Sequence, residues 1–195
     1  MILKDKLFGL VLSGGKSTRM GIDKGSINYH GIPHREYLLN LLGKLCDKVF
    51  LSVSEEQMPE VSHDVKIIVD ENQHRGPFNG LLSAHHKFPE AAWLVLACDL
   101  PLIDKNSLER LIQKRNPKKF ATAFATHASK LPEPLCAIWE SMALQKAEEN
   151  LKAGAGSCPR KFLINSDIQL VFPEDDKVLF NANSMEDYNE VITKL

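Results

Sequence analysis

Short apolar runs separated by polar segments recur along the chain and predict its secondary structure. Two runs, 7–12 and 92–98, are almost continuously apolar, which is typical of strands buried on both faces of a parallel sheet. Shorter apolar runs predict further strands at 48–54, 65–69, 120–126, 135–139, 168–172 and 178–180.

Apolar positions at helical spacing lie between most of these strands. They predict helices at 36–45, 78–88, 106–115, 141–151, 159–163 and 184–195. Pro77 suits the start of the second helix, and Ser184 with Asp187 resembles a capping box at the start of the last. This alternation predicts an α/β fold with a mostly parallel sheet and helices on both of its faces.

The segment after the first strand combines a glycine turn with basic residues. Adjacent glycines let the backbone turn sharply and approach a ligand, and exposed amides in such a turn bind anions. Lysine and arginine add positive charge that suits phosphate oxygens. The sequence therefore predicts a polyphosphate cradle at the carboxyl end of the first strand. Its members are Ser13, Gly14, Gly15, Lys16, Arg19 and Lys24.

Two known nucleotide-binding motifs fit this segment only in part. Gly15-Lys16-Ser17 resembles the end of a Walker phosphate loop, but the first glycine of that motif would fall on Leu10. The dinucleotide fingerprint G-x-G-x-x-G fails because the glycine spacing differs. A phosphate-binding turn of another kind remains.

Two aspartates follow other predicted strands: Asp70 after 65–69 and Asp99 after 92–98. Ligands of open α/β sheets bind beyond the carboxyl ends of the strands, so we expect both acids to lie beside the glycine turn. A carboxylate at the end of a buried strand is costly unless it is paired or binds a metal. Asp99 either caps the turn before Pro101 or binds Mg²⁺, and the nearby glycine turn favours the metal. Asp70 is alternatively a simple turn residue.

Four further residues, Gly76, Gly80, Asn181 and Asn183, give a weaker signal. The two glycines either form a tight helix start or let a ligand approach the backbone closely. The two asparagines lie on the same side of an extended segment that follows the predicted strand 178–180, so they could reach one ligand. Asparagine is equally common in turns.

Composition narrows the class of protein. The 195 residues are 44% hydrophobic and 25% charged, which predicts one folded domain spanning 1–195 rather than a disordered chain. A net charge of −1 argues against a nucleic-acid partner. The 4 cysteines lack C-x-x-C spacing and favour reduced thiols over a disulfide framework or zinc site. No apolar run suits a signal peptide or membrane span, so we expect a cytoplasmic protein without a membrane partner.

Five motifs occur in order: GLVLSGGKSTRMGIDK (9–24), VD (69–70), GPFNGLLSA (76–84), CDLP (98–101) and NAN (181–183). Together they resemble the MobA-type molybdenum cofactor guanylyltransferases over nearly the whole chain, although sugar-phosphate and cytidylyl transferases share the first motif. The resemblance implies a Rossmann-like nucleotidyltransferase fold, with a nucleotide-binding part of about 1–105 and an acceptor-binding part of about 106–195. It implies transfer of GMP from GTP to molybdopterin, with Mg²⁺ as the cofactor and pyrophosphate as the product.

The resemblance also assigns roles to individual residues. GTP contacts would fall on Leu12, Ser13, Gly14, Lys24, Asp70 and Asp99, the last of which would also bind Mg²⁺. Asn181 and Asn183 would lie close by, with Asn183 as a helper to the metal. Two positions depart from the family pattern: Ser13 replaces the usual alanine, and Ser52 stands where relatives often have asparagine. The segments 134–139 and 154–162, the second with Arg160, resemble the acceptor side.

The mechanism expected from these residues is charge neutralisation and positioning. Lys16 and Arg19 would hold the leaving phosphates, Lys24 would stabilise charge near the α-phosphate, and Asp99 would hold the metal. Three alternatives stay open: a cytidylyltransferase for the same cofactor, a sugar- or polyol-phosphate nucleotidyltransferase, and a nucleotide-binding module without catalysis. The resemblance further suggests a protein that receives the finished cofactor.

Overall fold

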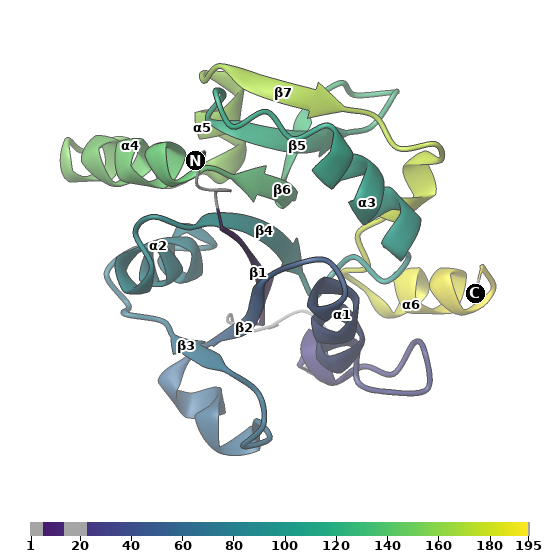
Figure 1. Cartoon of the computed structure of the whole chain (residues 1–195). Helices are drawn as coiled ribbons and strands as arrows, with labels where there is room; N and C mark the ends of the chain where they lie inside the picture. Colours follow the sequence, from purple (N-terminus) through teal and green to yellow (C-terminus); the bar gives the residue numbers. More distant parts are fainter. Residues whose placement is uncertain (1–5, 14–22, 195) are drawn as a thin grey trace.

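A computed structural model describes residues 6–13 and 23–194 of the chain. Its strands form one seven-stranded sheet in the order β3-β2-β1-β4-β6-β5-β7 (Figure 1). β6 pairs antiparallel with β4 and β5, and the remaining pairs are parallel. The strands are β1 (Leu7–Leu12), β2 (Lys48–Val53), β3 (Ile67–Val69), β4 (Ala92–Ala97), β5 (Ala121–Ala125), β6 (Pro132–Trp139) and β7 (Ile168–Val171).

Helices connect most of the strands, as the sequence predicts. The α-helices are α1 (His34–Gly43), α2 (Phe78–Lys87), α3 (Lys105–Gln113), α4 (Ser141–Lys152), α5 (Pro159–Ile164) and α6 (Met185–Ile192). The described residues also form the 3₁₀ segments η1 (Lys24–Ser26), η2 (Glu55–Glu60) and η3 (Asp176–Leu179). The capping box of Ser184 and Asp187 at the start of α6 is confirmed. The α/β fold with a mostly parallel sheet is confirmed as well.

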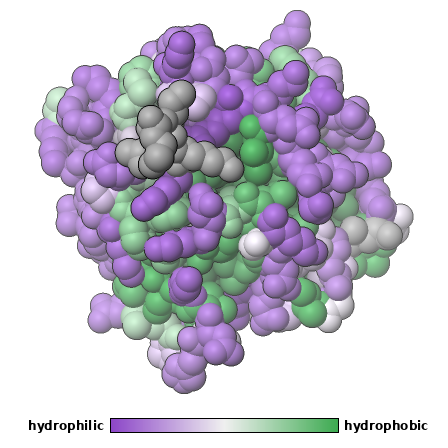
Figure 2. Space-filling model, viewed as in Figure 1, coloured by the Kyte–Doolittle hydropathy of each residue, from purple (hydrophilic) through white to green (hydrophobic). Residues whose placement is uncertain are grey.

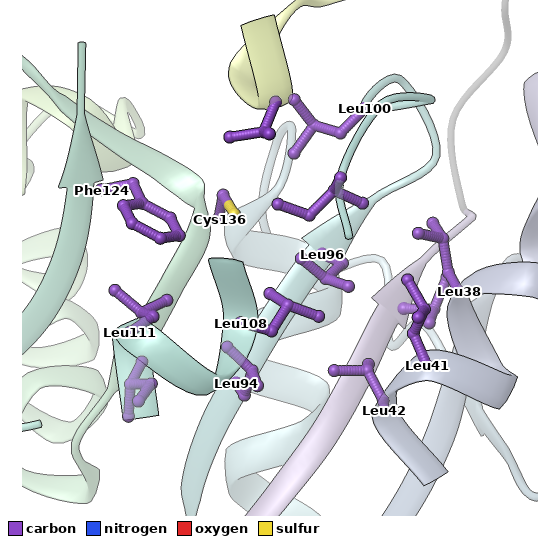
Figure 3. Close-up of a cluster of buried hydrophobic side chains, with 14 of the residues drawn as sticks. Leu38, Leu41, Leu42, Leu94, Leu96, Leu100, Leu108, Leu111, Phe124 and Cys136 are labelled. Atoms are coloured by element: carbon purple, nitrogen blue, oxygen red, sulfur yellow. The ribbon is translucent and has the colours of Figure 1, made fainter. Parts of the chain in front are cut away.

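Two apolar layers hold the helices against the sheet. On one face, leucines of α1 and α3 pack against β4 and its neighbours (Figure 3). On the other face, α2, α4 and α5 cover a cluster that includes the fully buried Trp93 and Trp139. Both faces are therefore covered, which explains why β1 and β4 are buried along their whole length.

The predicted strand 178–180 is wrong, because Val178 and Leu179 belong to the 3₁₀ turn η3 and Phe180 is the residue that caps it. Val178 and Leu179 are both buried in the same apolar cluster. An extended strand would point two consecutive side chains to opposite faces, whereas a helical turn brings both into one core. The Asp175 side chain supports the turn by accepting a hydrogen bond from the Lys177 amide at 2.9 Å.

The reversed direction of β6 places its first residues at the functional edge of the sheet. Its pairing with β4 runs from Trp139 opposite Trp93 to Cys136 opposite Leu96. Residues before Cys136 therefore extend past the paired part of β4, toward the segment that follows its carboxyl end. There the indole nitrogen of Trp139 donates a hydrogen bond to the Pro134 carbonyl at 2.9 Å and fixes the segment's path.

The face seen in Figure 1 is polar around its periphery, while apolar residues gather toward its middle (Figure 2). Within the described part of the chain, no helix has the length and apolar character needed to cross a membrane.

Candidate active site

One half of the candidate site lies where β1, β2 and β3 end. Ser52, near the end of β2, donates a hydrogen bond from its hydroxyl to Asp70 Oδ1 at 2.6 Å. Asp70 follows β3 directly, and its amide donates to the Val53 carbonyl at 2.9 Å. The parallel pairing of the strands thus brings together side chains that are 18 positions apart in the sequence. Burial raises the pKa of Asp70, and the hydrogen bond from Ser52 opposes that rise.

Gly80 on α2 completes this half by its lack of a side chain. A Cβ atom there would lie 2.4 Å from Ser52 Oγ, 2.8 Å from Leu12 Cδ2 and 3.3 Å from Asp70 Oδ1. Glycine is therefore needed for α2 to approach the strand ends this closely. The structure brings four residues predicted from the sequence, Leu12, Ser52, Asp70 and Gly80, into one cluster.

The other half of the site is formed around Asp99, directly beyond β4. Its Oδ1 atom is buried and has no hydrogen-bond partner in the part of the chain that the structure describes. Burial raises the pKa of Asp99; the positive charge of Lys24 opposes this shift, and the negative charge of Glu133 adds to it. An unpaired buried carboxylate oxygen is costly, so this atom is suited to receiving a cation or a donor from a ligand.

Lys24 and the segment after η3 meet beside Asp99. The Lys24 ammonium group donates to Asn183 Oδ1 at 2.6 Å, and the Ala182 amide donates to the Asp99 carbonyl at 2.9 Å. Asn183 itself is held at the start of α6, where its amide donates to Asp187 Oδ2 at 2.7 Å. Three predicted residues, Lys24, Asp99 and Asn183, thus converge from distant parts of the sequence.

Several predicted site residues are placed differently or lie outside the described residues. The Asn181 amide group donates to the Leu179 carbonyl at 3.2 Å, so η3 and not a shared strand face determines its direction. Gly76 has a φ of +67°, and a Cβ atom on it would have no neighbour within 4 Å, which indicates a turn residue rather than a close contact. Gly14, Gly15, Lys16 and Arg19 lie outside the described residues.

Three residues of the site were missed by sequence reasoning: Gly25, Arg35 and Glu133. A Cβ atom on Gly25 would lie 2.7 Å from the hydroxyl oxygen of Ser13, which is itself buried at the end of β1. Glu133 reaches the site only because β6 is antiparallel, and its carboxylate binds Arg160 at 2.7 Å. Arg35 lies on α1 and binds Asp23. Only Gly25, which directly follows the basic segment, carried any sequence signal.

The donor set suits a metal shared with a substrate better than a metal held by protein alone. Among residues 6–13 and 23–194, no group of three or more histidine, cysteine, aspartate or glutamate side chains could hold an ion. Mg²⁺ typically binds through one or two carboxylates and completes its shell with phosphate oxygens and water. Asp99, with its unpartnered oxygen, fits that role.

Comparison with known proteins identifies the family. The profile of the MobA-like NTP transferase domain matches residues 9–168. The chain belongs to this family. It is therefore a MobA-like nucleotidyltransferase, as its motifs predict, and the two halves described above lie within the matched range except for 181–183.

Relatives of this MobA-like nucleotidyltransferase agree with the assignment. The molybdenum cofactor biosynthesis bifunctional protein of Synechocystis sp. is 39% identical over 186 residues, which are 95% of this chain and 53% of that protein, so the chain spans about half of that relative. The molybdenum cofactor guanylyltransferase of Ectopseudomonas mendocina is 29% identical over 91% of this chain and 87% of its own. Molybdopterin-guanine dinucleotide biosynthesis protein A of Archaeoglobus fulgidus has the same fold, with a TM-score of 0.78, 20% identity, and coverage of 96% and 97%.

Proposed function

We propose that this nucleotidyltransferase transfers GMP from GTP to the phosphate of molybdopterin and releases pyrophosphate, with Mg²⁺ as cofactor. The names of the relatives support GTP and molybdopterin as substrates. The observation that carries the proposal is the buried Asp99 Oδ1 without a partner among the described residues, beside the ammonium group of Lys24. That pair suits a reaction centre between phosphate groups, where a cation and a positive side chain are both needed.

The nucleotide would lie across the ends of β1, β2 and β3. Leu12, Ser52, Asp70 and Gly80 already form a close-packed wall there, and Asp70 presents an acceptor to donor groups of the nucleoside. The basic segment would hold the triphosphate, with the amides of Gly14 and Gly15 and the side chains of Lys16 and Arg19 on the phosphates that leave.

The chemical step is displacement at the α-phosphorus. A phosphate oxygen of the acceptor forms the new bond, the bond to the bridging oxygen breaks, and pyrophosphate leaves with that electron pair. The acceptor phosphate is already an anion at neutral pH, so the site needs no strong base. Its task is to bring two anions together, which Lys24 would favour by stabilising charge near the α-phosphate.

Mg²⁺ held by Asp99 would neutralise charge on the phosphate oxygens. Asn183 would assist by holding Lys24 beside Asp99, through the hydrogen bond at 2.6 Å. On the acceptor side, Glu133 and Arg160 form an ion pair at 2.7 Å, and Arg160 also donates to the Pro132 carbonyl at 3.1 Å. The negative charge of Glu133 also acts on Asp99, and the pair would form part of the molybdopterin site.

The test is pyrophosphate release from GTP, CTP and ATP, each with and without molybdopterin. We expect release only with GTP, Mg²⁺ and molybdopterin together. Release with CTP instead would establish a cytidylyltransferase, release with a sugar or polyol phosphate would establish a different acceptor, and nucleotide binding without release would establish a binding module.

A variant sharpens this test. Asp99→Ala should lower metal-dependent turnover by at least a few hundredfold, on the order of 3–4 kcal/mol of barrier, while the protein stays folded. The control is Glu174→Ala, because the Glu174 side chain is 88% exposed and lies outside the site. Normal turnover in Asp99→Ala would remove Asp99 from the mechanism. Handover of the product to another protein is expected from the family resemblance and would be tested separately by pull-down with molybdoenzyme apoproteins.

A further inference from the structure

An ion pair between Arg35 and Asp23 lies directly behind the site. Arg35 Nη1 and Asp23 Oδ2 are 2.9 Å apart, and the two side chains are only 13% and 27% exposed. Burial raises the pKa of the Cys98 thiol; the charge of Asp23 adds to that rise and the charge of Arg35 opposes it. Because Cys98 is the neighbour of Asp99, the ion pair lies close to the end of β4. The mechanism proposed above does not use this pair.

Asp23 connects this ion pair to the turn that holds Lys24. Its second oxygen, Oδ1, accepts a hydrogen bond from the Gly25 amide at 3.0 Å and so caps η1, the turn whose first residue is Lys24. The Asp23 carbonyl accepts two further bonds from Ser26, from the amide at 3.0 Å and from the hydroxyl at 2.7 Å. With both carboxylate oxygens and the carbonyl engaged, the backbone conformation at Lys24 is fixed from the Asp23 side.

Gly25 makes this arrangement tight. A Cβ atom on Gly25 would lie 3.3 Å from Arg35 Cβ and 2.7 Å from Ser13 Oγ, so η1 packs directly between α1 and the end of β1. Lys24 extends from this packed turn to Asn183 Oδ1 at 2.6 Å, and its charge opposes the rise that burial causes in the pKa of Asp99. A continuous set of contacts therefore connects Arg35 on α1 to the ammonium group beside Asp99.

The burial of α1 against the sheet comes from its leucines rather than from this ion pair. Leu38, Leu41 and Leu42 bury the helix against the sheet, with exposed fractions of 0%, 6% and 0%. Removing one partner of a largely buried ion pair also lowers the free energy of unfolding, and the urea measurement below reports that effect. The distinct contribution of the ion pair is geometric, because a guanidinium group is planar and holds a carboxylate oxygen in a fixed direction, which an ammonium group does not.

We propose that Arg35 is a positioning residue for the transfer reaction, acting through Asp23 to hold Lys24 beside Asp99. The proposal rests on the function proposed above, in which Lys24 stabilises charge at the α-phosphate. It goes further by assigning the alignment of Lys24 to a side chain on α1 that does not touch the substrate.

The experiment compares Arg35→Met, Arg35→Lys and Asp23→Asn with the wild type. Methionine keeps an apolar stem against Gly25 and removes only the charged group. The matched control is Lys105→Met, which removes an exposed ion pair with Glu109, at 2.9 Å, that no step of the proposed mechanism uses. Urea unfolding of each variant checks that the fold is retained.

The first measurement is pyrophosphate release with GTP, Mg²⁺ and molybdopterin. Loss of one well-placed donor to a transition state lowers kcat about 10²- to 10³-fold, so its misalignment in Arg35→Met should lower kcat about 10- to 100-fold. KM for GTP should change less than about threefold, because the affected interaction is made mainly in the transition state. Arg35→Lys should restore only part of kcat, and Lys105→Met should match the wild type.

A double variant separates positioning from a general structural effect. If Arg35 acts through Lys24, Arg35→Met should add little to the loss already caused by Lys24→Ala. A full additional loss in that background would overturn the proposal, as would an unchanged kcat in Arg35→Met.

The second measurement does not need turnover. Amine labelling of the protein, followed by mass spectrometry, gives the reaction rate of each lysine. Lys24 should label several times faster in Arg35→Met and Asp23→Asn, whereas Lys105 should be unchanged. An unchanged Lys24 rate would overturn the positioning role, while faster labelling in a protein that transfers no nucleotide would uphold it and overturn only the proposed function.

Discussion

The structure constrains the identity of Gly80 strongly. A Cβ atom there would lie 2.4 Å from Ser52 Oγ and 2.8 Å from Leu12 Cδ2, both of which belong to packed strand ends. We expect Gly80→Ala to lower the free energy of unfolding by about 1–3 kcal/mol, because the strand ends would have to move. It should also weaken GTP binding, since Ser52 would lose its position beside Asp70.

Gly43 offers a matched control for this substitution. It also lies on a helix, but a Cβ atom there would have no neighbour within 4 Å. Gly43→Ala should leave stability unchanged or raise it by about 0.5–1 kcal/mol, because alanine restricts the unfolded chain. Urea unfolding of both variants checks the difference; equal effects would mean that α2 can move away from the strand ends at low cost.

His34 is a buried histidine that should make the protein sensitive to acid. Its side chain has 0% exposure, and burial together with the neighbouring His30 lowers the pKa of His34 to about 4. The unfolded chain would take up this proton near pH 6.5, so stability should fall as the pH drops from about 6.5 toward 4. The full contribution is on the order of 3 kcal/mol.

The acid sensitivity of His34 is measurable by difference. Between pH 7.5 and pH 5, the wild type should lose about 2 kcal/mol more than His34→Leu, because the carboxylate contributions are common to both proteins. Urea unfolding at the two pH values gives the comparison. Parallel losses in the two proteins would show that His34 keeps its ordinary pKa.

At the residue scale, the sequence predicted positions at the ends of strands and missed contacts that depend on packing. Asp70 and Asp99 were found because parallel strands end at one edge. Arg35 and Glu133 could not be found, because an arginine on a helix and a glutamate before a strand carry no local signal. The direction of Asn181 depended on a strand that the structure replaces with η3.

At the element scale, the regular strands and helices were predicted within a few residues, because the apolar runs of the strands and the helical spacing of apolar residues are both evident in the sequence. The two misses have physical causes. Residues 178–180 form part of a turn because two adjacent apolar side chains share one core. β6 begins at Pro132 rather than Leu135. Its prolines lie outside the section that pairs with β4, and Pro132 lies opposite Ala125 of β5 beside an irregularity in that pairing, a position that tolerates proline.

His86 on α2 contacts two carboxylates, one on α4 and one in the segment that follows β3. His86 Nδ1 lies 2.8 Å from Glu71 Oε2, and Nε2 lies 3.1 Å from Glu148 Oε1. Partial burial lowers the pKa of His86, but the hydrogen bonds with Glu71 and Glu148 outweigh it, so the pKa is raised overall. Both nitrogens can donate only when the ring is positively charged.

The sign of the pH dependence is therefore opposite to that of His34. The contribution of His86 to stability should be complete below about pH 6.5 and be lost as the pH rises through its raised pKa. We expect His86→Gln to be more destabilising at pH 6 than at pH 8.5, measured by urea unfolding. Glu148→Gln should reduce that difference, and a pH-independent effect of His86→Gln would contradict the charged bridge.

At the scale of the whole molecule, strand direction decides which residues meet. The parallel strands β1 to β4 bring Leu12, Ser52, Asp70 and Asp99 to one edge, and the sequence predicted this because helices alternate with strands. The antiparallel β6 then brings its first residues to the same edge from the acceptor half of the chain. No local pattern specifies that reversal, so the meeting of the two halves at Asp99 and Glu133 emerged only from the structure.

Because the two halves of the site lie at one edge of the sheet, a bound nucleotide would contact β1 to β4 and the segment before α6 together. We therefore expect a nucleotide to stabilise the whole fold. GTP with Mg²⁺ at 100 times its dissociation constant should raise the free energy of unfolding by about 2.7 kcal/mol. CTP and ATP at the same concentration should raise the free energy of unfolding by less.

The effect of Mg²⁺ on this stabilisation tests the role of Asp99. In Asp99→Asn the stabilisation by GTP alone should persist while the added effect of Mg²⁺ disappears, since the substitution removes the negative charge and keeps the shape. Urea unfolding with each nucleotide, with and without Mg²⁺, provides the measurement, and Glu174→Gln serves as the exposed control. Equal Mg²⁺ effects in Asp99→Asn and the control would place the metal elsewhere.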